Sequence, residues 1–206
     1  LECRRVLFRS CHASFTLPAG KEQPLHWRVL PDDATPSFLE IWLPPRDQNP
    51  DVAVHVTAPW GDQSGWITKQ QIHTWKQGTE VLGTIIFLER AATGNGTMVL
   101  IALAPTFTFE AGRTVPPAGN WEVRVKNQGT GDVKVDAWIQ RDETAYGYAR
   151  RGRQSRFEDP NYVRFDAFTR LKEEDDEGPY APKTEGDRKA YVKRENTLSA
   201  IATGEH

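Results

Sequence analysis

The sequence predicts an all-β protein, an antiparallel β-sandwich of jelly-roll type followed by a long irregular C-terminal strap. About seven or eight short segments between residues 26 and 140 alternate apolar and polar side chains, and none of them shows a helical period. The 14 prolines and 16 glycines are spread between these segments as turn residues. Hydrophobic residues make up 38% of the 206 residues, which is enough for one buried core.

The first ten residues, LECRRVLFRS, resemble the translated product of a sequencing-library adapter, and we expect residues 1–10 to be an artefact outside the fold. The alternative is a short basic amphipathic start. Without Cys3, Cys11 is the one cysteine left, so no intramolecular disulfide is expected and the redox compartment cannot be read. Residues 11–25 carry turn residues without a sustained period and are predicted to be a connecting segment ahead of the sandwich.

The predicted sandwich domain covers residues 26–142. Its candidate strands lie at residues 26–30, 37–43, 52–58, 81–88 and 97–104. The last two are apolar on both faces, which favours a central place in a two-layer packing, and Gly94-Asn95-Gly96 predicts a hairpin between them. Residues 60–80 are mostly polar and are predicted to form a surface loop with one short strand.

Residues 119–142, GNWEVRVKNQGTGDVKVDAWIQRD, predict a β-hairpin that closes the sandwich. Each half alternates strictly, with Trp121 and Val123 on the apolar face of the first half and Val133 and Val135 on that of the second. Two glycines between the halves supply the positive φ angles of a short connection. Trp138 lies on the polar face, so we expect the strap or another domain to cover it.

The composition changes after Arg141, and residues 143–206 are predicted to be an extended strap across a partner domain. They hold a basic run at 150–153, an acidic run at 173–177 and scattered aromatic residues. Residues 197–204, TLSAIATG, are small and apolar and are predicted to begin a buried strand.

The charge and hydropathy patterns of the sequence argue against nucleic acid, metal and membrane partners. The formal net charge is −2, so the basic stretch at 150–156 is predicted to be plain surface or to form intramolecular ion pairs. The acidic run at 173–177 lacks the spaced ligands and turn glycine of a calcium loop and is predicted to be solvated. No run of about 18 apolar residues is present, so no membrane span is expected.

Three other features could suggest chemistry, and each has a structural interpretation. Cys11 and His12 could pair as nucleophile and base, but neighbours in sequence rarely face each other. His55 lies mid-strand and is predicted to be a satisfied structural histidine. Asn95-Gly96-Thr97 fits a glycosylation pattern and is interpreted first as a turn. The sequence therefore gives no catalytic, cofactor-binding or metal-ligating residue.

The runs AGNWEVRVKN, VDAWIQRD, RGRQSRF and TLSAIATG together resemble the large insertion carried by some bacterial subtilisin-like serine proteases. In such enzymes a β-sandwich interrupts the catalytic α/β domain, between the strand bearing the oxyanion asparagine and the return strand before the catalytic serine. The resemblance covers residues 11–206, and its Ala-Ile-Ala-Thr-Gly ending departs from the family's usual Val-Gly-Ala.

The resemblance implies proteolysis by a Ser-His-Asp triad that lies outside this fragment. None of the serines has the family's Gly-Thr-Ser context and none of the histidines has its histidine motif: Ser14, Ser37, Ser64, Ser155, Ser199, His12, His26, His55, His73 and His206. We therefore expect the fragment itself to be inactive and to need no cofactor, with calcium left open for the full-length enzyme. The resemblance also implies a catalytic α/β domain of the same chain and a protein substrate as partners, in a bacterial protein that is secreted or extracytoplasmic.

The alternative function is a carbohydrate- or protein-binding β-sandwich module. In that case Trp60, Trp66 and Trp75 of residues 60–80 would stack on a glycan, although packing within the core and loops is the favoured interpretation of these side chains.

Overall fold

The structure is a computed structural model that describes residues 11–48, 50–91, 96–140 and 152–158. All of these belong to one compact unit that extends to Pro160. A second unit, Asn161–His206, lies outside the described residues, and with it lie the predicted acidic run and the predicted return strand.

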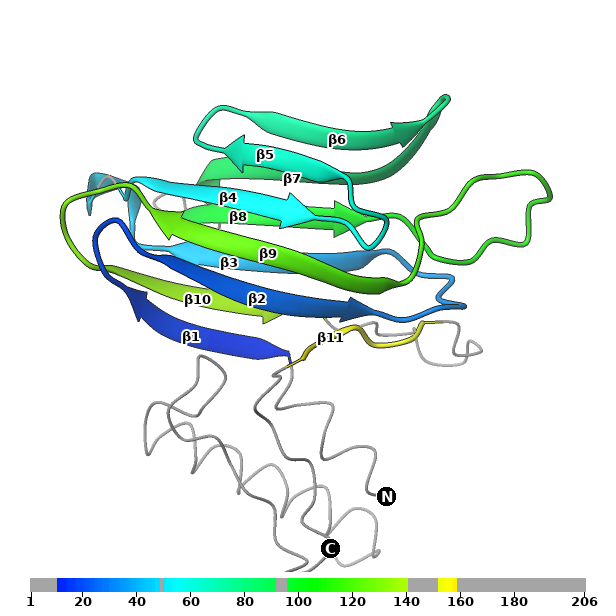
Figure 1. Cartoon of the computed structure of the whole chain (residues 1–206), viewed down its shortest axis with the longest axis horizontal. Helices are drawn as coiled ribbons and strands as arrows, with labels where there is room; N and C mark the ends of the chain where they lie inside the picture. The colour runs from blue at the N-terminus through cyan, green and yellow to red at the C-terminus, as the bar shows by residue number, and fades with distance from the viewer. Residues whose placement is uncertain (1–10, 49, 92–95, 141–151, 159–206) are drawn as a thin grey trace, which may run out of the picture. The chain divides into compact units, whose positions relative to one another are not determined.

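The described chain is all-β, as predicted, and its strands form two antiparallel sheets (Figure 1). Sheet A has six strands in the order β1-β10-β3-β8-β7-β6, and sheet B has five in the order β11-β2-β9-β4-β5. The bounds are β1 His12–Leu17, β2 Glu22–Val29, β3 Ser37–Leu43, β4 Val52–Thr57, β5 Gln63–Ile67, β6 Ile72–Gln77, β7 Glu80–Ala91, β8 Gly96–Leu103, β9 Gly119–Asn127, β10 Val133–Ile139 and β11 Arg156–Phe157. The described residues contain one 3-10 turn, Arg46–Gln48, and no helix long and apolar enough to cross a membrane.

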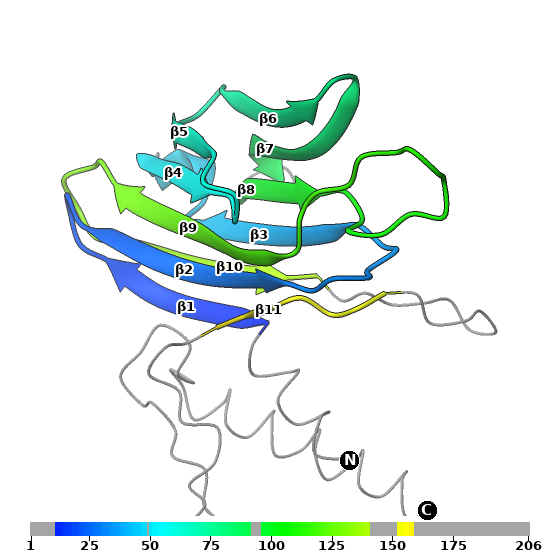
Figure 2. The same ribbon diagram turned by 45° about the vertical axis from the view of Figure 1, so that its right-hand side comes forward.

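The two sheets have the strand order of a jelly roll. Strands β1-β10-β3-β8 and β2-β9-β4-β5 form the two four-stranded layers, and the chain changes layer at most of its connections (Figure 2). The hairpin of β6 and β7 extends the first layer beside β8, and β11 extends the second beside β2. The predicted β-sandwich is thereby confirmed.

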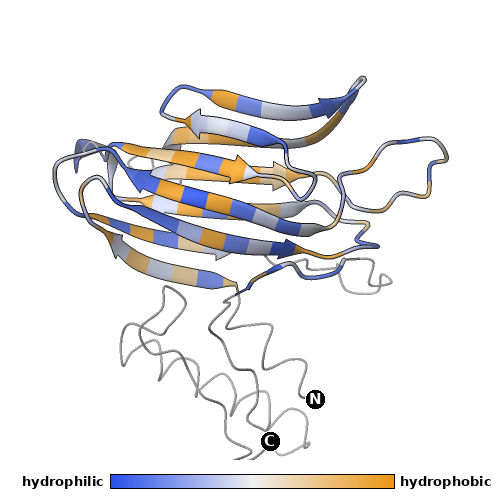
Figure 3. Cartoon of the chain, in the orientation of Figure 1, coloured by the Kyte–Doolittle hydropathy of each residue, from blue (hydrophilic) through white to orange (hydrophobic). Residues whose placement is uncertain are grey.

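The core lies between the sheets and is built from the alternation that predicted the strands (Figure 3). In β9, Trp121, Val123 and Val125 are fully buried, while the residues between them face outward. Trp121 pairs across the ladder with Trp27 of β2, and both indoles are 0% exposed. These two tryptophans are the largest fully buried side chains of the described core.

The predicted hairpin at residues 119–142 is wrong, although both of its strands exist. Strand β9 pairs with β2 and β4 in sheet B, whereas β10 pairs with β1 and β3 in sheet A. The connection therefore arches from one layer to the other. Alternation fixes which side chains face the core, but it does not say whether the next strand is a ladder partner or lies across the core.

Two segments hold more strand than predicted. Residues 11–25, predicted as a connecting segment, contain β1 and the start of β2, and residues 60–80 contain both β5 and β6. An edge strand buries only a few inward side chains, such as Ala13, Phe15 and Leu17 of β1, so the apolar alternation in its sequence is weak. Strands β7 and β8 pair directly and lie inside sheet A, which confirms their predicted pairing and central position.

Candidate interaction site

The outer face of sheet A carries an unusual number of apolar side chains. The ladder registers align Trp138, Glu40, Leu100, Ile86 and Ile72 in one row across β10, β3, β8, β7 and β6. Adjoining rows add Phe38, Trp42, Leu88 and the mostly buried Met98, and we call all of these residues together the sheet A patch. Ile72 is 66% exposed and Trp138 is 47% exposed. Apolar side chains gathered on one outer face make this surface a candidate for an interaction site.

Glu40 is held in place inside the sheet A patch. Its carboxylate accepts one hydrogen bond from Trp42 Nε1 at 2.9 Å and another from the Gln140 side-chain amide. Because neighbouring side chains already donate to this carboxylate, a partner that buried the patch would not leave Glu40 without hydrogen bonds.

Trp138 lies beside the first strand of the chain. The ring of His12 stacks on its indole, with centroids 3.7 Å apart and planes 16° apart, and His12 Nε2 lies 3.5 Å from Asp136 Oδ1. Burial raises the pKa of Asp136, but the Ser14 hydrogen bond, Lys134 and His12 outweigh it and hold the pKa below its ordinary value. This contact lies within sheet A, between neighbouring strands, and Trp138 remains 47% exposed, so the cover predicted from the strap or another domain stays a prediction. Residues 143–151 and 159–206 of the predicted strap lie outside the described residues.

The start of β1 and the segment at 152–158 meet at one edge of the sandwich (Figure 1). Cys11 Sγ lies 3.8 Å from the Ser155 carbonyl oxygen, and Gln154 Nε2 donates to the Gln140 carbonyl at 3.0 Å. The Glu158 amide donates to the His26 carbonyl at 2.8 Å, which continues the β11–β2 ladder. The chain therefore enters β1 next to Ser155, the residue that precedes β11. Cys11 and His12 contact different partners here, Ser155 and Trp138.

Phe157 anchors the segment at 152–158. It is 3% exposed and lies opposite Trp27 in the β11–β2 ladder. We expect Phe157→Ala to lower the free energy of unfolding by about 1.5–3 kcal/mol, the transfer cost of a buried phenyl ring. Urea unfolding of the 206-residue chain followed by circular dichroism measures this.

The matched control for this change is Phe109→Ala, which removes a phenyl ring that is 71% exposed. It should change stability by less than about 0.5 kcal/mol. Equal effects of the two substitutions would mean that Phe157 does not anchor the segment.

The outer face of sheet B is charged, in contrast to sheet A. Arg124 lies 3.7 Å from Glu22 and 3.5 Å from Glu122, and Lys126 lies 3.6 Å from Glu22. Both cations lie over the ring of Trp66, with Arg124 Cζ at 5.5 Å and Lys126 Nζ at 5.4 Å from its centroid. Each of these four charged side chains has an oppositely charged partner on the same face, so this surface is suited to contact with solvent.

The structure separates the three tryptophans of residues 60–80. Trp75 faces the core and is 5% exposed, Trp60 packs edge-on against Trp121 at 5.2 Å, and Trp66 lies on the outer face of sheet B. Trp75 also contacts Trp121 edge-on, at 5.3 Å. A sugar-stacking platform needs coplanar exposed rings, and these three side chains do not form one.

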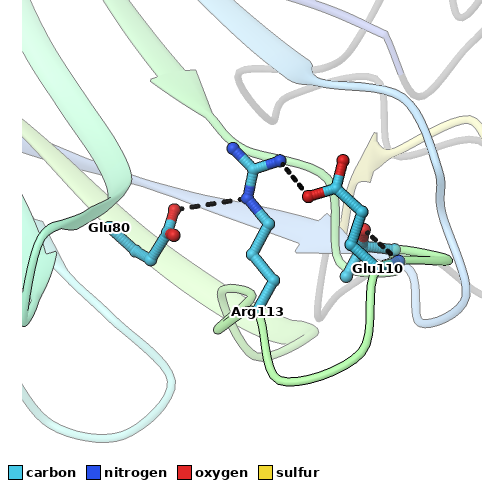
Figure 4. Close-up of polar contacts among 4 residues, drawn as sticks. Glu80, Glu110 and Arg113 are labelled. Carbon is cyan, nitrogen blue, oxygen red and sulfur yellow. Dashed lines mark hydrogen bonds and ion pairs between the residues drawn. The ribbon is translucent and has the colours of Figure 1, made fainter.

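The loop between β8 and β9 is fastened to the start of β7 by an arginine. Arg113 Nε lies 3.3 Å from Glu80 Oε2, and Arg113 Nη1 lies 3.0 Å from Glu110 Oε2 (Figure 4). The hydrogen bond to Glu80 and the two carboxylates raise the pKa of Arg113. All three side chains are exposed, so the contacts orient the loop and add little stability.

Within the part of the chain that the structure describes, no group of three or more His, Cys, Asp or Glu residues comes together as a metal site. Of the predicted turn at Asn95-Gly96-Thr97, Asn95 lies outside the described residues, and Gly96 and Thr97 begin β8. Sequence reasoning missed the sheet A patch as a surface, although the apolar outer residues of 81–88 and 97–104 already signalled it.

Among solved structures, the protein is similar to the CspB protease of Clostridium perfringens, with a TM-score of 0.52 and 18% sequence identity. The match covers 74% of this chain and 28% of that chain, so this protein spans less than a third of the protease it resembles. At this identity the likeness concerns the fold. It shows that a sandwich of this kind occurs in a protease. No family model matches the sequence, and no curated protein matches it either.

Proposed function

We propose that this β-sandwich is a non-catalytic domain inserted into a subtilisin-like serine endopeptidase, whose triad lies outside the 206 residues. The observation that carries the proposal is the meeting of the two chain paths, with Cys11 Sγ 3.8 Å from the Ser155 carbonyl oxygen. A domain whose ends lie side by side can interrupt a host domain without separating the host's strands. The likeness to part of a protease supports the same conclusion.

The catalytic α/β domain of the same protein is the partner we propose for the sheet A patch. Trp138 lies next to the point where the chain enters the sandwich, so the host domain would emerge beside it. The patch offers apolar surface to a packed interface, whereas the outer face of sheet B offers paired charges. We further propose a protein substrate for the whole enzyme, a secreted or extracytoplasmic bacterial location, and calcium, if any, in the catalytic domain.

The sequence that flanks residues 11–206 in the source gene tests this proposal. A Gly-Thr-Ser motif should follow downstream, before the next domain boundary, and an asparagine-bearing strand should precede the sandwich. An in-frame stop codon without that motif would overturn the proposal.

The purified 206-residue chain should not cleave casein, because the proposal places all three triad residues elsewhere. Release of labelled peptides from casein measures this, with a commercial subtilisin as the positive control. Turnover that co-purifies with the chain and is abolished by a serine-directed phosphonate would show that the chain contains a triad of its own.

A further inference from the structure

We propose that His55 is a pH-sensitive latch, which holds the edge strand β5 on sheet B in neutral solution and releases it in mildly acidic solution. The inference concerns the sandwich alone and does not depend on the proposed protease. It is carried by the way β5 is attached, by the burial of His55 and by the partners of its imidazole.

Strand β5 is attached to sheet B on one side, through β4. The β4–β5 register is irregular between His55 and Thr57, and on β5 the opposing Gly65 has a φ of 68°. There the Val56 amide donates to Ser64 Oγ at 2.9 Å, in place of a backbone carbonyl. The regular part of the attachment is therefore short, and it is centred on the pairs of His55 with Trp66 and of Val54 with Ile67.

His55 is only 4% exposed although it lies on the outer face of sheet B. Its Nδ1 lies 3.3 Å from Arg124 Nη2, and its ring packs against Trp66 with centroids 5.4 Å apart. Arginine can only donate, so Nδ1 accepts and the imidazole is neutral with its proton on Nε2. The side chain of Gln63, on β5, forms a further hydrogen bond with His55. The neutral ring therefore bridges β9 and β5.

Protonation removes the acceptor that Arg124 uses and brings two cations together. The groups that face His55 are Arg124, Lys126 and Glu122 on β9, Glu22 on β2, and Gln63 and Trp66 on β5. The hydrogen bond to Gln63 favours the charged ring, as do Glu122 and Glu22, but both carboxylates already pair with Arg124, and Glu22 also with Lys126. Burial is the largest influence and, with Arg124, it lowers the pKa of His55 below its ordinary value.

The sign of the pH dependence follows from this lowered pKa. When β5 is detached, Trp66 no longer covers the imidazole, so burial opposes its protonation less than in the attached form. Attachment is therefore strongest above the ordinary pKa of histidine and weakens as the pH falls towards the lowered one. Release of β5 would leave the hydrogen-bonding edge of β4 open to another strand.

Hydrogen exchange by NMR on the 206-residue chain tests the latch, at about pH 7.5 and about pH 5, with rates corrected for intrinsic exchange. We expect protection of the β4–β5 ladder amides to fall several-fold at the lower pH, while the β2–β9 ladder keeps its protection. In His55→Gln, where the amide oxygen can still accept from Arg124, protection should be equal at the two pH values. His73→Gln is the control, because burial also lowers the pKa of His73, and this variant should keep the pH dependence of β5.

The proposal is overturned if β4–β5 protection does not change with pH, if His55→Gln keeps the full pH dependence, or if all ladders lose protection together. Should His55→Gln fail to fold, the unmodified chain still decides the question. Titration of the His55 ring resonances and the pH dependence of the Trp66 indole resonance must then show the same midpoint. Different midpoints would equally overturn the proposal.

Discussion

Replacing Trp121 by alanine should lower the free energy of unfolding by about 3–5 kcal/mol, the usual range for removing a large aromatic side chain from a packed core. The indole is 0% exposed, and the rings of Trp60 and Trp75 pack edge-on against it at 5.2 and 5.3 Å. It also pairs with Trp27 across the β2–β9 ladder. One truncation therefore opens a cavity where strand β9, strand β6 and the β4–β5 turn meet.

Urea unfolding followed by far-ultraviolet circular dichroism measures this effect, because a fluorescence signal from seven tryptophans would change with the substitution itself. Trp138→Ala removes the same side chain from a site that is 47% exposed and should cost less than half as much. If the two substitutions destabilise equally, Trp121 does not have the central position described above.

Asn127→Ala should destabilise the fold by about 2–4 kcal/mol, because a buried side chain with several hydrogen bonds leaves backbone groups unsatisfied when it is removed. Asn127 is 0% exposed at the end of β9. Its Nδ2 donates to the carbonyls of Leu17 at 2.9 Å and Gly131 at 2.7 Å, and its Oδ1 accepts from the Gly129 amide at 2.9 Å. The side chain thus joins the β9–β10 arch to the end of β1.

Two comparisons refine the Asn127 prediction, both by the same unfolding measurement. Asn120→Ala, at an exposed position on the same strand, should change stability by less than about 0.5 kcal/mol. Asn127→Asp keeps the acceptor for Gly129 but loses both donors, so it should remain clearly destabilising. A variant Asn127→Asp as stable as the unmodified chain would show that the bonds to the two carbonyls contribute little.

The fold class could be predicted because alternation reports directly on which side chains face the core. The predicted strand at residues 37–43 matches β3, and those at 52–58, 81–88 and 97–104 overlap β4, β7 and β8. What alternation does not encode is the ladder partner. The arch after Asn127 is held by a hydrogen bond to Leu17, a residue 110 positions away, which no local pattern around the turn reports.

The candidate site could be predicted only in part. Trp138 was predicted correctly to face outward, whereas the cover predicted for it, by the strap or another domain, stays a prediction; its contact with His12 of the neighbouring strand β1 joins opposite ends of the domain. His55 was predicted to be a satisfied structural histidine, and its contacts with Arg124 and Trp66 agree with that prediction. Its partner Arg124 is 69 positions away, so the bridge between β9 and β5 becomes visible only once the strands are paired.

The position of β1 and β11 also has a mechanical consequence. Each is the outermost strand of its sheet, and the chain passes into one and out of the other. A pull transmitted through these two points would load the edge ladders first and would peel them bond by bond, starting with the two-residue strand that Phe157 anchors. The interior ladders around Trp27 and Trp121 join longer strands, so the two edges would separate before them, and the sandwich could yield at its attachment while its core remained folded.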